Sequence, residues 1–256
     1  MDAIAFTEKY FQKFLFDGFG GQTDRRCVVR DQLILLLMHG TGVRESEPMH
    51  LYVQDIHRDR DTSDSVVISL YHTEDGKTPD NWKDKNGSSN RSAYLRAKFG
   101  LVARNRIHTT RHAGWKSVVV DDKTNYMQLF WFPETLGSLF SQLWNEYLYH
   151  LSMIERDHPY AFISFHPKYI GQPNTLNAFK DNYNRALKRI GLSPGKTEGL
   201  SPHGHRHAYG RRVQQTGVEP LVIQKALHHK SLESQAIYTA PSMGDVTRAL
   251  FITHIK

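Results

Sequence analysis

S-P-H-G-H-R-H-A-Y-G-R-R-V, residues 201–213, opens the stretch of this sequence that decides its fold. T-G-V-E-P-L-V-I-Q-K-A-L-H-H-K-S follows at 216–231, and A-I-Y-T-A-P at 236–241. Ser201 and Glu219 each precede a proline, and proline is favoured at the first position of a helix. Ser231 begins another short polar-to-apolar segment. The stretch therefore predicts three short helices in succession, the last with Tyr238 near its end.

These three helices bring cations and one phenol into a short length of chain. His203 and Arg206 are three residues apart, so they share one face of a helix. His229 lies in the second segment, and Tyr238 follows nine residues later. A guanidinium binds two phosphate oxygens at once, an imidazole transfers protons near neutral pH, and a phenol can be a covalent nucleophile. The set fits the attack of a tyrosine on a phosphodiester.

Two other interpretations of this stretch are a metal site and a basic helical surface. His203, His205 and His207 alternate, as metal ligands sometimes do. Residues i, i+2 and i+4 of a helix do not share a face, however, and Arg206 lies among them instead of a carboxylate. The sequence therefore disfavours a metal site. The remaining alternative is a basic helical surface without catalytic chemistry.

A second motif lies near the start of the chain, H-G-T-G-V-R-E-S-E-P-M-H-L-Y-V-Q-D-I at 39–56. With it, the sequence resembles the catalytic domain of the tyrosine recombinase (phage integrase) family. That family's first box reads T-G-h-R-x-x-E-h-x-x-L-x-x-x-D-h, where h is apolar, and residues 41–56 fit it. Its second box, H-x-L-R-H, then L-G-H-x-S and a tyrosine nine residues after the histidine, corresponds to 203–207, 227–231 and Tyr238. The resemblance covers about residues 24–241.

The chain departs from the family pattern at two positions. His205 occupies the place where leucine is usual, and His228 the place where glycine is usual. Neither change removes a catalytic group. A histidine at 228 is expected to crowd the backbone at the start of a helix.

The resemblance implies a role for each site residue. Arg44 and Arg206 would clamp the scissile phosphate, His203 would be the base for the phenol, and His229 would donate a hydrogen bond to phosphate. Tyr238 would attack and form a 3′-phosphotyrosine, and a hairpin lysine would protonate the leaving 5′-oxygen. The phosphotyrosine keeps the bond energy, so the family needs neither a nucleotide cofactor nor a metal. Glu47 is expected to brace Arg44 or to cap a backbone group, the alternative being a solvated carboxylate.

The hairpin lysine is hard to place from the sequence. Lys116, Lys77 and Lys123 all lie between the two boxes. We predict Lys116, because it would begin a strand over 115–120, and sites on strands are held more rigidly than sites on loops. Lys77 follows a predicted strand, Val66–Tyr71, and Lys123 lies in a predicted turn.

Composition is compatible with a nucleic-acid partner. The 256 residues contain 33 Lys and Arg against 26 Asp and Glu, a net charge of +7 with a pI near 9.4. A basic chain suits a polyanion, although many soluble proteins are mildly basic. Cys27 is the single cysteine, which excludes an internal disulfide and implies a reducing compartment. The sequence contains no apolar run of about 18 residues, so no membrane span is expected.

The predicted fold class is α+β, mostly helical, with a small antiparallel sheet. Residues 1–23 are predicted to be an N-terminal helix and linker, and 24–241 the catalytic domain. Asp24 is expected to cap a helix over 25–39, with further helices at 92–99, 134–151 and 175–189 and a strand at 126–132. Only 23 residues precede Asp24, too few for the core-binding domain that the family usually places there. We therefore expect a catalytic-domain fragment, or a chain that uses its N-terminal helix and insertion instead.

Two segments depart from a minimal catalytic domain. Residues 73–114 are polar and basic and are predicted to be a partly ordered insertion. Its arginines and lysine at Arg91, Arg96, Lys98, Arg104, Arg106 and Arg111 would either contact DNA phosphates or form a solvated face, and the sequence favours neither. The tail at 242–256 includes Val246, Leu250, Phe251 and Ile252. It would pack within its own chain or on a neighbouring protomer, and the resemblance favours the neighbour.

Taken together, the resemblance predicts a DNA site-specific recombinase or integrase, typical of mobile genetic elements. Its partner would be a double-stranded attachment or recombination site, bound by a homo-oligomer, a tetramer, in the bacterial cytoplasm at the nucleoid. Two alternatives from other classes stay open. A type IB topoisomerase uses a similar set of residues but relaxes supercoils without choosing a site, and a non-catalytic module would bind DNA without cleaving it.

Overall fold

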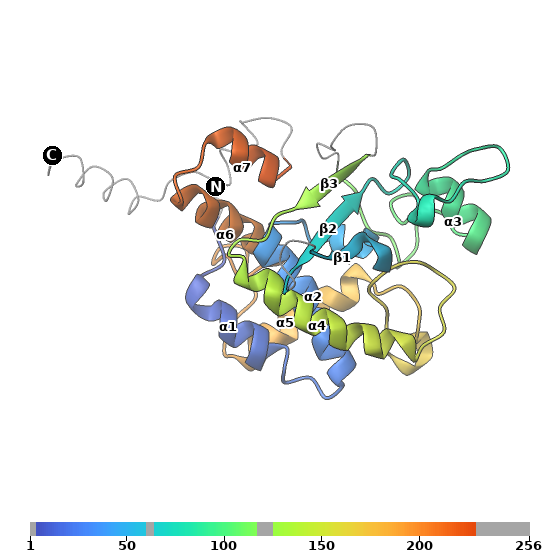
Figure 1. Ribbon diagram of the computed structural model, residues 1–256. Coiled ribbons are helices and arrows are strands. Elements are labelled where there is room, and N and C mark those ends of the chain that lie inside the picture. The colour runs from blue at the N-terminus through green and yellow to red at the C-terminus, as the bar shows by residue number, and fades with distance from the viewer. Residues whose placement is uncertain (1–3, 60–63, 117–124, 229–256) are drawn as a thin grey trace, which may run out of the picture.

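The structure, a computed structural model, describes residues 4–59, 64–116 and 125–228. In these ranges the chain is mostly helical with one small antiparallel sheet, which confirms the predicted fold class (Figure 1). The helices are α1 (Phe11–Lys13), α2 (Arg25–Thr41), α3 (Arg91–Phe99), α4 (Thr135–Ser152), α5 (Leu176–Arg189), α6 (Pro202–Gln215) and α7 (Pro220–Ala226). The strands are β1 (Ile56–Arg58), β2 (Val66–Tyr71) and β3 (Tyr126–Leu129). A π-helical turn over Phe14–Gly18 continues α1, and 3-10 helices cover Glu8–Tyr10, Glu47–His50, Val53–Asp55, Pro79–Asn81 and Pro167–Tyr169. Among the described residues, no helix is long and apolar enough to cross a membrane.

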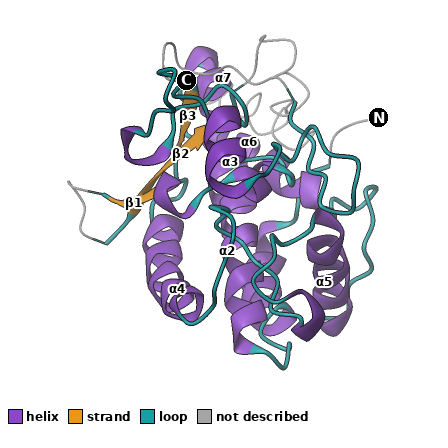
Figure 2. Ribbon diagram, turned by 90° about the vertical axis from the view of Figure 1, so that its right-hand side faces the viewer, coloured by secondary structure: helices purple, strands orange, loops and turns teal. Residues whose placement is uncertain are grey.

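Helix α2 forms the centre of the core. It lies between α4 and α5 (Figure 2), and its residues are buried from Val28 to Thr41. The Asp24 side chain accepts a hydrogen bond from the Arg26 amide at 2.9 Å, which satisfies one of the free amides at the start of the helix. This confirms Asp24 as the cap. A helix buried on all sides places its last residue, and the loop that follows it, at a fixed point in the molecule.

The sheet has the order β1-β2-β3, with both pairs antiparallel. In β2, Val66, Ile68 and Leu70 are buried and alternate with partly exposed residues, as expected for a strand with one face on the core. Ile68 pairs with both Ile56 and Leu129, so the register keeps the apolar side chains on one face. The predicted strand at 66–71 is confirmed, and β1 was not predicted.

The N-terminal segment packs into the same core. Phe6, Phe14 and Phe19 are buried, and the Phe14 ring lies 4.9 Å from that of Tyr183 on α5. The Phe6 amide donates to the Gly204 carbonyl at 2.9 Å. A side chain at Gly204 would meet the Gly199 carbonyl oxygen at 2.0 Å, so glycine permits this close approach. The segment predicted as a helix and linker thus lies directly against α6.

Two arginines of the insertion are buried, which neither sequence interpretation anticipated. Arg91 donates to both carboxylate oxygens of Asp55 and to the Lys77 carbonyl, and its guanidinium lies 4.1 Å from the centre of the Tyr52 ring. Arg104 donates to the carbonyls of Met49, Asn174 and Arg111 at 2.7–2.9 Å. For Arg91 and Arg104, both the phosphate-contact and the solvated-face predictions are therefore wrong. They are structural residues.

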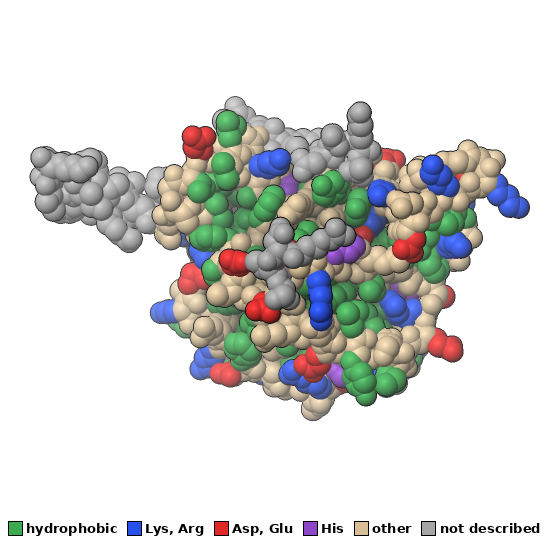
Figure 3. All heavy atoms as spheres, in the orientation of Figure 1, with side chains coloured by type: hydrophobic (Ala, Val, Ile, Leu, Met, Phe, Trp, Pro, Cys, Tyr) green, Lys and Arg blue, Asp and Glu red, His purple; other side chains and the backbone are tan. Residues whose placement is uncertain are grey.

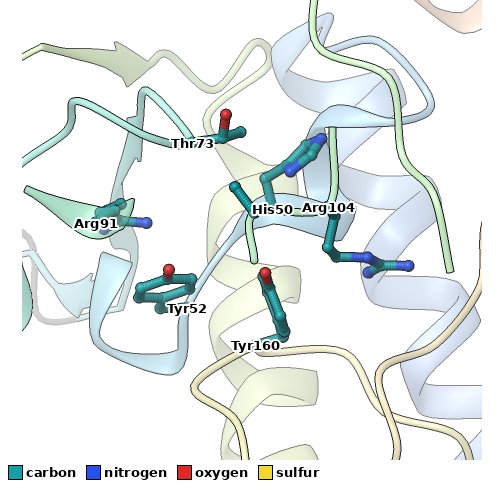
Figure 4. A pocket seen from close by; sticks show the side chains of 7 residues that line it. His50, Tyr52, Thr73, Arg91, Arg104 and Tyr160 are labelled. Atoms are coloured by element: carbon teal, nitrogen blue, oxygen red, sulfur yellow. The ribbon is translucent and has the colours of Figure 1, made fainter. Parts of the chain in front are cut away.

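These two arginines attach the insertion to the rest of the domain. Figure 4 shows that Thr73, Arg91 and Arg104 line one small pocket together with His50, Tyr52 and Tyr160. The side chains come from both sides of the junction between 73–114 and the body of the protein. A buried cation that donates to carbonyl oxygens or to a carboxylate is stable only while every partner is present. The attachment therefore depends on few, well-defined contacts.

We predict that Arg91→Met lowers the free energy of unfolding by about 3 to 5 kcal/mol, because it leaves the buried Asp55 carboxylate without its cation. Urea denaturation monitored by circular dichroism measures the change. Arg96→Met is the matched control, since Arg96 is exposed on the same helix, and it should change stability by less than about 0.5 kcal/mol. Equal effects of the two substitutions would contradict the structural role of Arg91.

Candidate functional site

Arg206 lies where the ends of two helices meet. It is 1% exposed, and its Nη1 donates to the Gly42 carbonyl at 2.6 Å and its Nη2 to the Leu227 carbonyl at 2.5 Å. Gly42 ends α2 and Leu227 ends α7. The carbonyls at a helix C-terminus lack partners within the helix and favour a nearby cation. Arg206 thus joins α2, α6 and α7.

Glycine is required at the end of α2. Gly42 has a φ of 70°, in the left-handed region, and a side chain there would lie 2.5 Å from the Tyr209 ring. The sharp turn that it forms leads directly into Arg44. Arg44 and Arg206 belong to separate sequence motifs. The turn at Gly42 brings the two motifs together, because its carbonyl accepts a hydrogen bond from Arg206.

Glu47 braces Arg44 and also caps its backbone. One carboxylate oxygen accepts from Arg44 Nη1 at 2.8 Å, and the other accepts from the Arg44 amide at 2.7 Å. Glu47 is buried, whereas the Arg44 side chain is 18% exposed. Both suggested roles are confirmed, and the solvated-carboxylate alternative is wrong. Arg44 lies in a loop rather than at a helix start, because the 3-10 helix begins at Glu47.

His203 lies close to three cations. Partial desolvation lowers its pKa, and the positive charges of Arg206, Arg44 and Lys116 lower it further, against the opposing effect of the Glu45 carboxylate. Such effects weaken with distance, so Arg44 in the loop after α2 and Lys116 in the segment before residue 117 both lie near His203 on α6. At neutral pH His203 is therefore uncharged and able to accept a proton. Residues that the sequence predicted separately converge here.

Lys116 is exposed and lies in a loop. Its position follows from the segment before it, where the Ala113 amide donates to the Arg104 carbonyl at 3.2 Å and His50 Nε2 donates to the Gly114 carbonyl at 3.3 Å. The expectation that Lys116 begins a strand is not met at 115 and 116, and 117–120 lie outside the described residues.

Lys77 is exposed and pairs with Asn90 in an isolated bridge. Lys123, His229 and Tyr238 also lie outside the described residues.

The three alternating histidines separate into two groups. The His203 and His207 rings are 4.6 Å apart, whereas His205 is fully buried on another side of α6. His205 Nδ1 lies 3.0 Å from His39 Nδ1, and its Nε2 lies 2.9 Å from the Tyr183 hydroxyl. Within the described ranges, no group of three His, Cys, Asp or Glu side chains is placed to hold a metal ion.

The His39–His205 pair is part of a buried polar network that sequence analysis missed. His39 Nε2 lies 3.2 Å from Glu8 Oε2 and 2.8 Å from Arg212 Nη1, and Arg212 forms an ion pair with Glu8. The network links the N-terminal segment, α2, α5 and α6. The network explains the departure at 205, because a leucine there would leave His39 Nδ1 without its hydrogen-bond partner. The sequence contains His39 and His205 far apart and indicates no contact between them. Only the fold brings the two rings together.

Burial keeps these histidines neutral and makes the fold sensitive to acid. Burial lowers the pKa of His39 to about 4, and that of His205 well below its ordinary value. The same cause lowers the pKa of His50 to about 3 and that of His158 to about 4. A histidine whose folded pKa is depressed contributes stability above its unfolded pKa near 6.5, and the contribution is lost as the pH falls.

We predict that the free energy of unfolding decreases as the pH falls from 6.5 toward 4, with each depressed histidine contributing up to about 1.4 kcal/mol per pH unit. His205→Leu should give a shallower decrease, because one buried titrating group is removed. Urea denaturation at a series of pH values measures the slope. The same substitution at the exposed His108 is the control and should leave the slope as it is. A wild-type slope in His205→Leu would argue against a buried neutral imidazole.

Comparison with known proteins agrees with this geometry. A sequence model described as "Phage integrase family" matches residues 133–244. Two curated relatives, each described as "Integrase/recombinase", come from Escherichia coli and Pseudomonas aeruginosa. Each is 22% identical over 208 residues, which are 81% of this chain and 53% of the relative. The chain thus spans about half the length of the curated relatives that it matches.

Solved structures show a similar fold. XerH site-specific recombinase bound to palindromic difH substrate, in a post-cleavage complex, superposes with a TM-score of 0.64 at 15% identity, covering 99% of this chain and 54% of XerH. XerA recombinase gives 0.59 at 16% identity, and Tn1549 transposon integrase in complex with transposon right end DNA gives 0.56 at 16% identity. Each of these two matches covers 99% of this chain and 66% of the other protein. At these identities the likeness concerns the fold.

Proposed function

We propose that this chain, which belongs to the phage integrase family of tyrosine recombinases, breaks and rejoins DNA at specific sites through a 3′-phosphotyrosine. The observation that supports this most directly is the convergence of Arg44, Arg206, Lys116 and His203 on one point. Several cations close together suit a single phosphodiester. The site needs no nucleotide cofactor and no metal in this scheme.

The two arginines would act on the scissile phosphate in different ways. The Arg206 guanidinium is held by two carbonyl oxygens and the Arg44 guanidinium by one oxygen of Glu47, so neither has to be ordered when DNA binds. Preorganised charge stabilises the extra negative charge of the transition state at little cost in reorganisation. His229 would donate a further hydrogen bond to the phosphate.

His203 would take the proton of the nucleophile. Its lowered pKa keeps the ring uncharged near neutral pH, which is the form that can accept a proton from the Tyr238 hydroxyl. Tyr238 would then attack phosphorus and displace the 5′-oxygen. Lys116, which lies close enough to His203 to affect its pKa, would protonate that oxygen as it leaves.

Tyr238→Phe tests the proposal. Removal of the phenolic oxygen should abolish the covalent protein–DNA complex, while folding and DNA affinity stay at the wild-type level. Incubation with supercoiled DNA and with duplexes that contain candidate attachment sites, followed by detergent trapping, measures the adduct. Site-independent relaxation by the wild type would indicate a type IB topoisomerase, and binding without any adduct would indicate a non-catalytic module.

Lys116→Ala should cleave ordinary DNA at least about 100-fold more slowly, because an alkoxide leaves poorly without a proton. With sulfur in place of the bridging 5′-oxygen, this variant should cleave at close to the wild-type rate, since a thiolate leaves unaided. Arg206→Ala is the matched control and should stay slow on both substrates. If Lys116→Ala is equally slow on both, the acid is another residue, and Lys77 and Lys123 should be compared in the same way.

Surface charge supports double-stranded DNA as the partner. Residues 73–114 contain nine Lys and Arg against four Asp and Glu, so this sixth of the chain contributes +5 of its net +7. Arg96, Lys98, Arg106 and Arg111 are exposed, and cationic side chains are visible around α3 in Figure 3. With Arg91 and Arg104 buried, these exposed residues are the ones that we expect to contact phosphates.

An apolar groove supports assembly on DNA. Its volume is about 470 Å³, and it is lined mainly by aromatic and aliphatic residues of α6, α7 and the segment after β3, among them Phe130, Tyr209, Val213, Leu221 and Val222. Figure 3 shows apolar side chains over α6 and α7 on the face in view. We propose that the apolar tail at 242–256 of a neighbouring copy occupies it, in a homo-oligomer, a tetramer, on DNA in the bacterial cytoplasm at the nucleoid.

A further inference from the structure

His228 has an unusual backbone for its residue type. It follows α7, and its φ is 52°, in the left-handed region that favours glycine. Glycine is the residue expected at this position of the motif, and the chain has histidine instead. The predicted crowding therefore appears as backbone strain. Strain of this kind persists only where the surrounding structure enforces it, and it is concentrated at functional sites.

The side chain of the same residue has a second unfavourable feature. His228 is 7% exposed, and within the part of the chain that the structure describes its Nε2 is buried without a hydrogen-bond partner. Buried polar atoms without a partner are uncommon, and each one calls for an explanation. The strained backbone and the unpartnered nitrogen of His228 together indicate that a bound ligand supplies a compensating interaction.

The surroundings of His228 indicate what that ligand is. Arg206 donates to the carbonyl of Leu227, the residue directly before it. Burial lowers the pKa of His228 to about 3, and the positive charges of Arg206, Arg44 and Lys225 lower it further, against the opposing effect of the Gln128 backbone. The imidazole is thus uncharged in the empty site, and its single proton is on Nδ1, because Nε2 has no partner and the other nitrogen meets the Gln128 backbone. A bound anion would offset the positive charge of these cations and raise the pKa of His228, so that Nε2 could take up a proton and donate to the anion.

We propose that His228 is a further phosphate-contacting residue, and that its Nε2 takes up a proton from solvent as the phosphodiester binds and donates a hydrogen bond to a nonbridging oxygen. This inference rests on the proposed function and adds a group at a position where the motif has none. It accounts for both the strained backbone and the buried nitrogen, because the ligand supplies the missing partner. The residue would act together with Arg44 and Arg206.

Substitution by glycine separates stability from function. His228→Gly removes the imidazole and relieves the backbone, so its thermal unfolding temperature should equal or exceed that of the wild type. Its rate of covalent adduct formation should fall at least about tenfold, and free imidazole added to the reaction should restore part of it. His228→Asn, which tolerates a left-handed backbone but is shorter, should be slowed in the same way. His108→Gly is the control for an exposed histidine and should react at the wild-type rate.

A wild-type rate in either His228→Gly or His228→Asn, whichever folds, would overturn the proposal, because the ring would then only fill space. A second measurement does not depend on cleavage. Inorganic phosphate should raise the unfolding temperature of the wild type more than chloride does at equal ionic strength, and His228→Gly should lose this difference. If the wild type forms no adduct but still shows the phosphate effect, and His228→Gly lacks it, the recombinase function fails while the phosphate contact stands. An equal phosphate effect in both proteins would count against His228.

Discussion

The guanidinium of Arg206, held between the carbonyls of Gly42 and Leu227, is the contact on which the candidate site depends. Both carbonyls belong to helix C-termini, where the backbone has unpaired acceptors and a partial negative charge. One cation satisfies both ends and ties α2 and α7 to α6. The charge that we propose to bind phosphate is therefore part of the framework, and its position cannot change without moving two helices.

This arrangement concentrates positive charge in a partly buried place. Arg44, Arg206 and Lys116 act on His203, and the two arginines also act on His228, so that the pKa of each imidazole is lowered. The empty site is electrostatically unfavourable, and an anion relieves it. Because the cations are already fixed by Glu47 and by backbone carbonyls, stabilisation of phosphate requires little rearrangement. The same neutral imidazoles that suit proton transfer make the fold sensitive to acid.

Buried arginines also explain how a long connection between β2 and β3 can position a site residue. Arg91 pairs with Asp55, and Arg104 donates to three carbonyls, two of them from distant parts of the chain. Through the Ala113 amide and the His50–Gly114 contact, this attachment reaches the segment just before Lys116. A loop is thus held in place by buried polar contacts, where sequence reasoning expected a strand.

The sequence by itself determined the fold class, the position of most helices and the two motifs with Arg44, His203 and Arg206, because helix caps, apolar periodicity and motif spacing are local properties. The tertiary structure decided which charged residues are buried and which pairs meet. Arg91 and Arg96 lie on one short helix, yet one is paired with Asp55 and the other is exposed. His39 and His205 are 166 residues apart and share a hydrogen bond. Burial and long-range pairing depend on how the whole chain packs, and no local pattern encodes them.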